Sequence, residues 1–190
     1  MQLNVPLISQ RPELPTGCEI TAVTMMLQYA GAAVNKVQLA KEMPRADSDC
    51  NLGFVGDPFT DNGNSIYPPA LLPLVTKYAG HATNLTGASL AELKQQLDAN
   101  NPVVIWVGEF DGFHTHALVL VGYNDTHVIV NDCWTNEITP LTNTEFTNIR
   151  QIKPIWHWVY RPRARNKKRP SKLFRWGAFR YQQLSQSSIK

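Results

Sequence analysis

The chain has 190 residues, a length that fits one compact domain better than two independent hydrophobic cores. Its 43% hydrophobic content is ordinary for a globular protein, and no stretch reaches the roughly 18 apolar residues of a membrane-spanning helix. The N-terminus has no basic segment followed by an apolar run, so no signal peptide is predicted. We therefore expect a cytoplasmic protein or a mature extracytoplasmic form.

Charge is distributed unevenly along the chain. Residues 161–190 contain ten of the 18 Lys and Arg and none of the 15 Asp and Glu, so residues 1–160 carry a net charge of −7 and the remainder +10. We predict a folded domain over residues 1–160 and a basic, aromatic tail over residues 161–190. Such segments can bind membrane surfaces, anionic polymers or nucleic acid. A solvated tail, or one folded onto the acidic body, is the alternative.

The first predicted helix begins close to a cysteine. Apolar residues recur at helical spacing from Ile20 to Leu27, which predicts a helix over about residues 17–30. Thr16 and Glu19 have the spacing of a capping box, which makes Thr16 the expected N-cap.

Three further helices are expected, from Asn35 to Pro44, from Pro68 to Tyr78 and from Ser89 to Ala99. Pro73 should distort the second of these. Residues 45–66, between the first and second of these helices, are rich in Asp, Asn and Gly and predict a long loop. We interpret this loop as a lid or part of a substrate groove.

After Pro102 the pattern changes to continuous apolar runs of strand length. Strands are predicted at residues 103–107, 117–123 and 128–130, with another around 156–160. Because the helices come first and an antiparallel sheet follows, the fold class is α+β.

The three cysteines, Cys18, Cys50 and Cys133, cannot all pair within one chain, and no CxxC element supports a zinc ribbon. An unpaired thiol in a chain with suitable histidines is a candidate nucleophile, whereas a buried thiol is otherwise a small hydrophobe. We favour the second interpretation for Cys50. Cys18 lies at a helix start, where free N–H groups and the helix dipole favour a thiolate, although a buried cysteine fits that position equally well.

Two residues of the predicted hairpin can supply a base and its orienting acid. If Tyr123 pairs with His127, Asp132 lies opposite Leu118 and therefore on the same face as His116. That diagonal is roughly 7–8 Å between backbone positions, within reach of an Asp side chain. A shift of one residue in register would separate the two onto opposite faces.

Two more residues bear on the site. His114 competes with His116 for the role of base, and we prefer His116 because it adjoins a rigid strand. Gln10, eight residues before Cys18, has an amide that can donate to an oxyanion together with the backbone N–H of Cys18. Its residue type alone fits a surface position.

Two segments resemble a known family. The run from Val5 to Glu19, which includes Pro15-Thr16-Gly17-Cys18-Glu19, resembles the nucleophile segment of a bacterial papain-like cysteine peptidase family. That family is similar to the double-glycine leader peptidases that process bacteriocin precursors. The run from His116 to Tyr123, with Asn131-Asp132, resembles its histidine and aspartate hairpin. The resemblance covers about residues 4–160.

The resemblance implies a papain-like fold, with helices packed on an antiparallel sheet, and a peptide or protein substrate. It assigns Gln10 to the oxyanion hole and makes Cys18 the nucleophile, His116 the base and Asp132 its partner. It implies no cofactor or metal. The family's hairpin commonly ends in Asp-Pro, whereas Cys133 follows Asp132 here, so a disulfide with Cys18 that switches activity off is one interpretation of this thiol.

Three classes of function remain open. A cysteine peptidase is the leading one, and the same groups would serve an acyl transferase or transglutaminase. A noncatalytic binding domain with a working basic tail is the second. The third is a metal protein that uses His114, His116, Asp132 and Cys133, although their spacing matches no strong metal signature.

Overall fold

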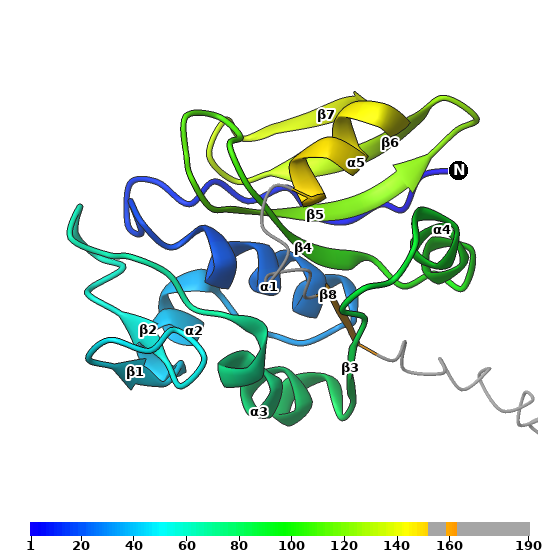
Figure 1. Ribbon diagram of the computed structural model, residues 1–190. Helices are drawn as coiled ribbons and strands as arrows, with labels where there is room; N and C mark the ends of the chain where they lie inside the picture. Colours follow the sequence, from blue (N-terminus) through cyan, green and yellow to red (C-terminus); the bar gives the residue numbers. More distant parts are fainter. Residues whose placement is uncertain (152–158, 163–190) are drawn as a thin grey trace, which may run out of the picture.

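The computed structural model describes residues 1–151 and 159–162 (Figure 1). The predicted basic tail, apart from Arg161 and Pro162, lies outside the described residues. The predicted domain boundary at residue 160 falls inside the last described strand, which ends at Pro162.

Most helices agree with the sequence prediction. The helices are α1 (Cys18–Tyr29), α2 (Lys36–Glu42), α3 (Pro68–Ala79), α4 (Leu90–Asp98) and α5 (Asn143–Gln151). The side chain of Asn35 caps α2, and Ser89 and Glu92 form the predicted capping box of α4. Pro73 lies in the interior of α3 on its exposed side, and the helix continues past it.

The strands are β1 (Arg45–Ala46), β2 (Phe54–Val55), β3 (Ala82–Asn84), β4 (Val103–Val107), β5 (His116–Tyr123), β6 (His127–Asp132), β7 (Glu137–Thr142) and β8 (Val159–Pro162). Six of these strands, in the described part of the chain, form one antiparallel sheet in the order β3-β8-β4-β5-β6-β7. β1 and β2 form a small parallel pair within the predicted long loop.

The first helix is central to the fold. Every residue of α1 from Cys18 to Leu27 is buried, rather than one face only, and the helix packs against β5, β4, α2 and α3. A helix that is buried on all sides lies inside a core rather than on its surface. Figure 1 shows α1, α2 and α3 together in the lower half of the molecule, with β5, β6, β7 and α5 in the upper half. The start of α1 therefore lies where the helical part meets the sheet.

The N-terminal segment runs along the β5–β6 hairpin toward the start of α1. Leu3 N–H donates to the Val121 carbonyl at 2.8 Å, and Gln2 forms a bridge with Gly122. A Cβ on Gly122 would lie only 2.7 Å from the Met1 carbonyl oxygen, so this close approach requires glycine. Farther along, Gln10 N–H donates to the Cys133 carbonyl at 2.9 Å, which places Gln10 beside the end of the hairpin.

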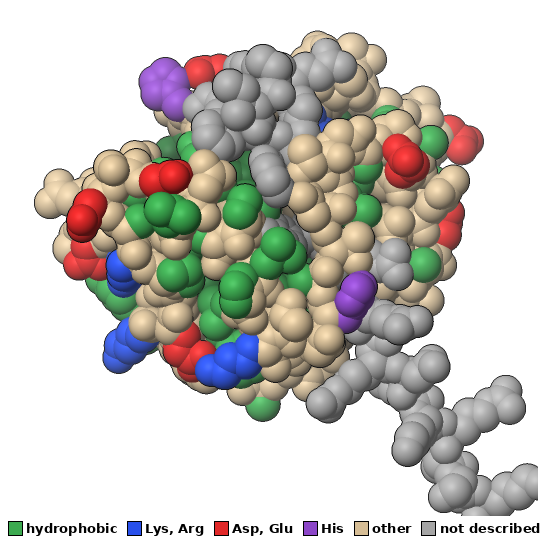
Figure 2. All heavy atoms as spheres, turned by 60° about the horizontal axis from the view of Figure 1, so that its bottom comes forward, with side chains coloured by type: hydrophobic (Ala, Val, Ile, Leu, Met, Phe, Trp, Pro, Cys, Tyr) green, Lys and Arg blue, Asp and Glu red, His purple; other side chains and the backbone are tan. Residues whose placement is uncertain are grey.

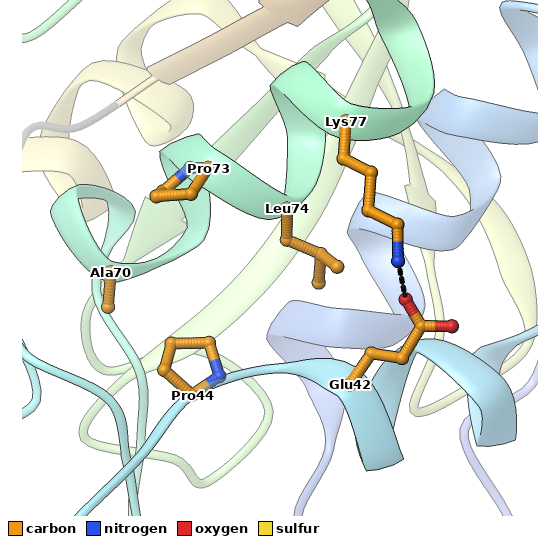
Figure 3. Close-up of a pocket in the computed structure, with 6 residues that line it drawn as sticks. All are labelled: Glu42, Pro44, Ala70, Pro73, Leu74 and Lys77. Atoms are coloured by element: carbon orange, nitrogen blue, oxygen red, sulfur yellow. Dashed lines mark hydrogen bonds and ion pairs between the residues drawn. The ribbon is translucent and has the colours of Figure 1, made fainter.

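One pocket lies away from this region. It has a volume of about 390 Å³ and lies between α2 and α3, where Lys77 and Glu42 form an ion pair (Figure 3). Figure 2 shows the surrounding face, on which apolar side chains gather in the middle and charged ones flank them. The lining residues are Glu42, Pro44, Ala70, Pro73, Leu74 and Lys77.

Candidate active site

The β5–β6 hairpin brings His116 and Asp132 together. Leu118 pairs with Asp132 across the hairpin, which places Asp132 on the same face of the sheet as His116. Nε2 of His116 lies 2.8 Å from Oδ1 of Asp132, and both side chains are 1% exposed. The predicted pairing is thus found at this end of the hairpin.

Asp132 is held by more than the imidazole. Its Oδ1 also accepts the backbone N–H of Trp134 at 2.8 Å, and its Oδ2 accepts the hydroxyl of Thr135 at 3.0 Å. Burial raises the pKa of Asp132, but hydrogen bonds from His116 and Asp111 and the charge of His116 outweigh burial and hold that pKa below its ordinary value. Asp132 is therefore an anion fixed in position.

The other imidazole nitrogen is free within the described part of the protein. Nδ1 of His116 is buried and has no hydrogen-bond partner there. A buried polar nitrogen without a partner is unusual and calls for an explanation. Because Nε2 faces the carboxylate, Nδ1 is the atom that can exchange a proton with a neighbouring group.

Aromatic rings cover the imidazole. The ring of Phe113 stacks on His116 with centroids 5.3 Å apart and an interplanar angle of 18°, and the ring of Phe110 lies 6.2 Å away. Phe113 also contacts Trp134 edge-on, and the guanidinium of Arg11 lies 3.8 Å over the Trp134 ring. These contacts restrict the imidazole to one orientation.

A tight turn places the two phenylalanines. Phe110 and Phe113 exchange backbone hydrogen bonds, and Asp111 and Gly112 between them have φ of +52° and +81°. Two positive φ values in a two-residue loop are the mark of a type I′ turn, which favours Asp-Gly. Burial and the neighbouring Asp132 raise the pKa of Asp111 to about 6.

Cys18 is the first residue of α1, whereas an N-cap at Thr16 would have made it the second. The N-cap is Gly17, and no side chain caps the helix, so the prediction of Thr16 as N-cap was wrong. The Thr16 hydroxyl donates to the Thr60 carbonyl at 2.9 Å instead, and the Glu19 carboxylate accepts from Ser65 at 2.5 Å. Both residues thus hold the 45–66 loop against the start of α1.

The surroundings of Cys18 do not favour a free thiolate. Burial, the charge of Glu19 and the nearby Cys133 raise the pKa of Cys18 well above its ordinary value, while a backbone hydrogen bond with Ala117 lowers it. The expected effect of the helix start is therefore outweighed. The contact with Ala117 places the thiol against β5, next to His116 in the chain.

Gln10 is buried rather than on the surface, with 1% of its area exposed. Its Nε2 donates to the Pro15 carbonyl at 2.8 Å, and its Oε1 accepts from the thiol of Cys133 at 3.2 Å. The backbone carbonyl of Gln10 accepts a hydrogen bond from the ammonium of Lys36 at 3.1 Å. The structure thus places Gln10 beside Cys133, and its donation to an oxyanion stays a prediction.

Of the remaining candidate residues, only Cys133 lies with His116 and Asp132. His114 is exposed, and its Nδ1 pairs with Glu109 at 2.7 Å, so His114 does not join the buried cluster. Cys50 is buried in the 45–66 loop. Ligand atoms of His116, Asp132 and Cys133 lie within 4.8 Å of one another, which is the metal-like grouping that the sequence raised, without His114.

Sequence reasoning missed several residues of this site. The Asp111-Gly112 pair is a recognised hairpin signal that would have placed Phe110 and Phe113 together. The roles of Trp134 and Ser65 depend on contacts across the fold, and no local pattern marks them.

The fold defines the class of the protein. A buried helix that begins with a cysteine and packs on an antiparallel sheet with a histidine and aspartate hairpin is the architecture of the papain-like cysteine peptidases. The chain belongs to the Peptidase_C39 like family, whose model matches residues 2–157. This confirms the family that the two sequence segments indicated.

Among known proteins, a candidate C39-like peptidase from Bacillus anthracis has a similar crystal structure, with 30% identity, a TM-score of 0.76 and coverage of 83% of this chain and 94% of that one. The uncharacterized protein YvpB of Bacillus subtilis (strain 168) is 34% identical over 159 residues, which span 68% of this chain but only 64% of YvpB. A double glycine motif protease from an AMS/PCAT transporter, solved with its leader peptide, shares the fold at 19% identity with a TM-score of 0.56. Among the residues that the structure describes, no helix has the length and apolar character needed to cross a membrane.

Proposed function

We propose that this protein is a cysteine peptidase that cleaves peptide or amide bonds, with Cys18 as nucleophile, His116 as general base, Asp132 as its orienting acid and Gln10 in the oxyanion hole. The observation that carries the proposal is the buried His116–Asp132 hydrogen bond of 2.8 Å, which leaves Nδ1 of His116 without a partner in the described chain. A base held at one nitrogen and open at the other is suited to activating a nucleophile.

The reaction follows from these roles. Nδ1 of His116 takes the proton of the Cys18 thiol as sulfur attacks the substrate carbonyl carbon. The carbonyl electron pair moves to oxygen, where the Cys18 backbone N–H and Nε2 of Gln10 stabilise it. The C–N bond then breaks, the amine leaves with the proton from His116, and an acyl thioester remains on Cys18.

The second half of the reaction releases the acyl group. His116 takes a proton from water, the resulting hydroxide attacks the thioester, and the thiol leaves with that proton. Because burial raises the pKa of Cys18, we expect a neutral thiol in the resting protein, with the proton transferred only during the attack. Asp132 stabilises the imidazolium that forms in both halves.

A peptide substrate is supported by the family and by the solved neighbour that holds a leader peptide. The 45–66 loop packs against the start of α1 through Thr16 and Glu19, so we assign it to the wall of the substrate groove. Binding of anionic surfaces or polymers by residues 161–190 stays a prediction, since all of them but Arg161 and Pro162 lie outside the described part of the chain.

The test is cleavage of a peptide library by the purified protein, read by mass spectrometry. Cys18→Ala and His116→Ala should each abolish cleavage, whereas His114→Ala, at the exposed histidine outside the buried cluster, should leave it intact. Cleavage that survives in Cys18→Ala would refute the proposal.

The same assay separates the alternatives. Addition of an amine acceptor diverts the thioester of an acyl transferase to an amide product, while a peptidase gives mainly the free acid. A noncatalytic domain forms no thioester on Cys18 with an activated acyl donor. Activity lost to a chelator would favour the metal interpretation of His116, Asp132 and Cys133.

A further inference from the structure

The amide of Gln10 is fixed at both ends. Its Nε2 donates one hydrogen to the carbonyl of Pro15 at 2.8 Å, and a carbonyl oxygen accepts only. Its Oε1 faces the thiol of Cys133 at 3.2 Å. A primary amide has two N–H donors, so one donor of Gln10 remains when Pro15 has taken the other.

The hydrogen-bond partner of Oε1 determines whether the second N–H of the Gln10 amide points toward the oxyanion. An amide that rotates by half a turn about its last bond exchanges oxygen and nitrogen, and Gln10 would then offer an acceptor where an oxyanion needs a donor. The Pro15 carbonyl opposes this rotation from one side. The thiol of Cys133, which is fully buried, is the contact that opposes it from the other.

Cys133 is itself well placed for this task. Its backbone carbonyl accepts the N–H of Gln10 at 2.9 Å, so the backbone and side chains of the two residues are joined twice. Its thiol also lies 3.6 Å from the carbonyl of Cys18 and 3.9 Å from that of Ala117. All these neighbours are oxygen acceptors, which favours a protonated thiol that donates.

The burial of Cys133 and the charges around it also favour the protonated thiol. Burial, then the charges of Asp132 and Glu19, raise the pKa of Cys133 well above its ordinary value. The thiol therefore keeps its proton through the neutral range and remains a donor. A thiolate at this position would repel Oε1 and release the amide.

We propose that Cys133 is a positioning residue, whose thiol donates to Oε1 of Gln10 and thereby keeps the free N–H of that amide directed at the oxyanion. This inference rests on the proposed function, because the oxyanion belongs to that reaction. It gives a role to the one residue that departs from the Asp-Pro ending of the resembled hairpin.

The kinetic test compares Cys133→Ala, which removes the donor, with Cys133→Ser, which replaces it by a hydroxyl. Loss of a whole oxyanion donor costs about 10²- to 10³-fold in kcat, so we expect Cys133→Ala to lower kcat by about tenfold while KM changes by less than about twofold. Cys133→Ser should recover most of the loss. Val128→Ala, which truncates a buried side chain at the far end of β6 from Cys133, should show no such effect.

A double mutant separates positioning from a general structural role. In the Gln10→Ala background, Cys133→Ala should change kcat by less than about twofold, because the amide that it orients is absent. Full additivity of the two substitutions would overturn the proposal. Equal activity of Cys133→Ala and the parent would overturn it as well.

A second measurement does not depend on activity. The side-chain amide protons of Gln10 in the labelled parent protein should exchange slowly with solvent in NMR spectra, and in Cys133→Ser they should do the same. In Cys133→Ala their exchange should accelerate. An unchanged Gln10 amide in Cys133→Ala would overturn the proposal even if the protein cleaved nothing, whereas lack of Cys18-dependent cleavage alone would overturn only the proposed function.

Discussion

The imidazole of His116 and the carboxylate of Asp132 form a buried pair, with Nε2 and Oδ1 2.8 Å apart and 1% of each residue exposed. The pair spans two neighbouring strands, so the geometry depends on their register. It also fixes the tautomer of the neutral ring, because the nitrogen that faces a carboxylate carries the proton. Nδ1 is then the basic nitrogen.

Asp132→Asn tests this arrangement. The amide keeps the shape of the side chain but permits the wrong tautomer and gives no charge to an imidazolium, so kcat should fall by about 10²-fold or more. Peptide cleavage measures this loss, with Glu109→Gln at the exposed His114 pair as the control. A kcat within about twofold of the parent would contradict the role of Asp132.

The stacked ring of Phe113 offers a second test. The centroid of the Phe113 ring lies 5.3 Å from that of the His116 imidazole. Phe113→Ala removes this contact, so the imidazole should be able to reorient and kcat should fall by about tenfold. Phe113→Tyr keeps the stack and should retain activity, whereas Phe113→Leu, which keeps bulk without an aromatic face, should resemble Phe113→Ala. If Phe113→Leu were fully active, bulk rather than stacking would explain the contact.

The register of the β5–β6 hairpin was predicted correctly at one end and wrongly at the other. Tyr123 pairs with Val128, not with His127, so the premise of the prediction was wrong. A bulge between Leu120 and Gly122 then shifts the register by one residue, and Leu118 meets Asp132 as predicted. Without the bulge, Asp132 would lie on the opposite face from His116.

Other elements differ for clear physical reasons. β7 escaped prediction because it is an edge strand with Pro140 inside it and little buried surface, a sequence that does not resemble a central strand. α5 had a usable signal, since Thr142 and Glu145 form a capping box. The elements α1, β4 and β5 were predictable because most of their residues are apolar and buried, a pattern that is visible in the sequence.

The ammonium of Lys36 holds the segment from Ser9 to Glu13, which contains Gln10. It donates to the carbonyls of Ser9 at 2.6 Å and Gln10 at 3.1 Å and pairs with Glu13 at 2.6 Å. Lys36→Met should therefore lower the free energy of unfolding by about 1–3 kcal/mol, as expected for hydrogen bonds to a charged group.

Urea unfolding measures that change, and kcat should fall with it because the backbone of Gln10 is less restrained. Lys41→Met, which removes an exposed lysine from the same helix, is the matched control. Equal stability of the two variants would show that the contacts of Lys36 contribute nothing specific.

The charge of Glu19 contributes, after burial, to the raised pKa of Cys18. Burial first and the charge of Glu19 second raise the pKa of Cys18, so Glu19→Gln should lower that pKa. Iodoacetamide should then label Cys18 faster around pH 8, below the ordinary thiol pKa of about 8.5. Burial, then the charges of Glu19 and Asp49, raise the pKa of Cys50, so Asp49→Asn should change labelling of Cys50 and not that of Cys18. Identical labelling of Cys18 in Glu19→Gln and the parent would contradict this electrostatic coupling.

The ion pair beside the pocket of Figure 3 makes stability depend on pH in a defined direction. Hydrogen bonds from Lys77, Tyr78 and Gln38 lower the pKa of Glu42 from 4.5 to about 2. A carboxyl group whose pKa is lower in the folded state stabilises that state above its unfolded pKa and loses the effect as pH falls toward the folded value. The contribution of Glu42 should thus be complete above pH 4.5 and decline between pH 4.5 and about 2.

Calorimetry of the parent and Glu42→Gln checks this sign. The difference in Tm between the two proteins should be largest at neutral pH and should shrink steadily as the solution is acidified below the unfolded pKa of Glu42. Glu137→Gln, an exposed change on β7, provides the control for a general loss of negative charge. A Tm difference that stayed constant on acidification would mean that the contacts between α2 and α3 stabilise the fold by packing rather than by the charge of Glu42.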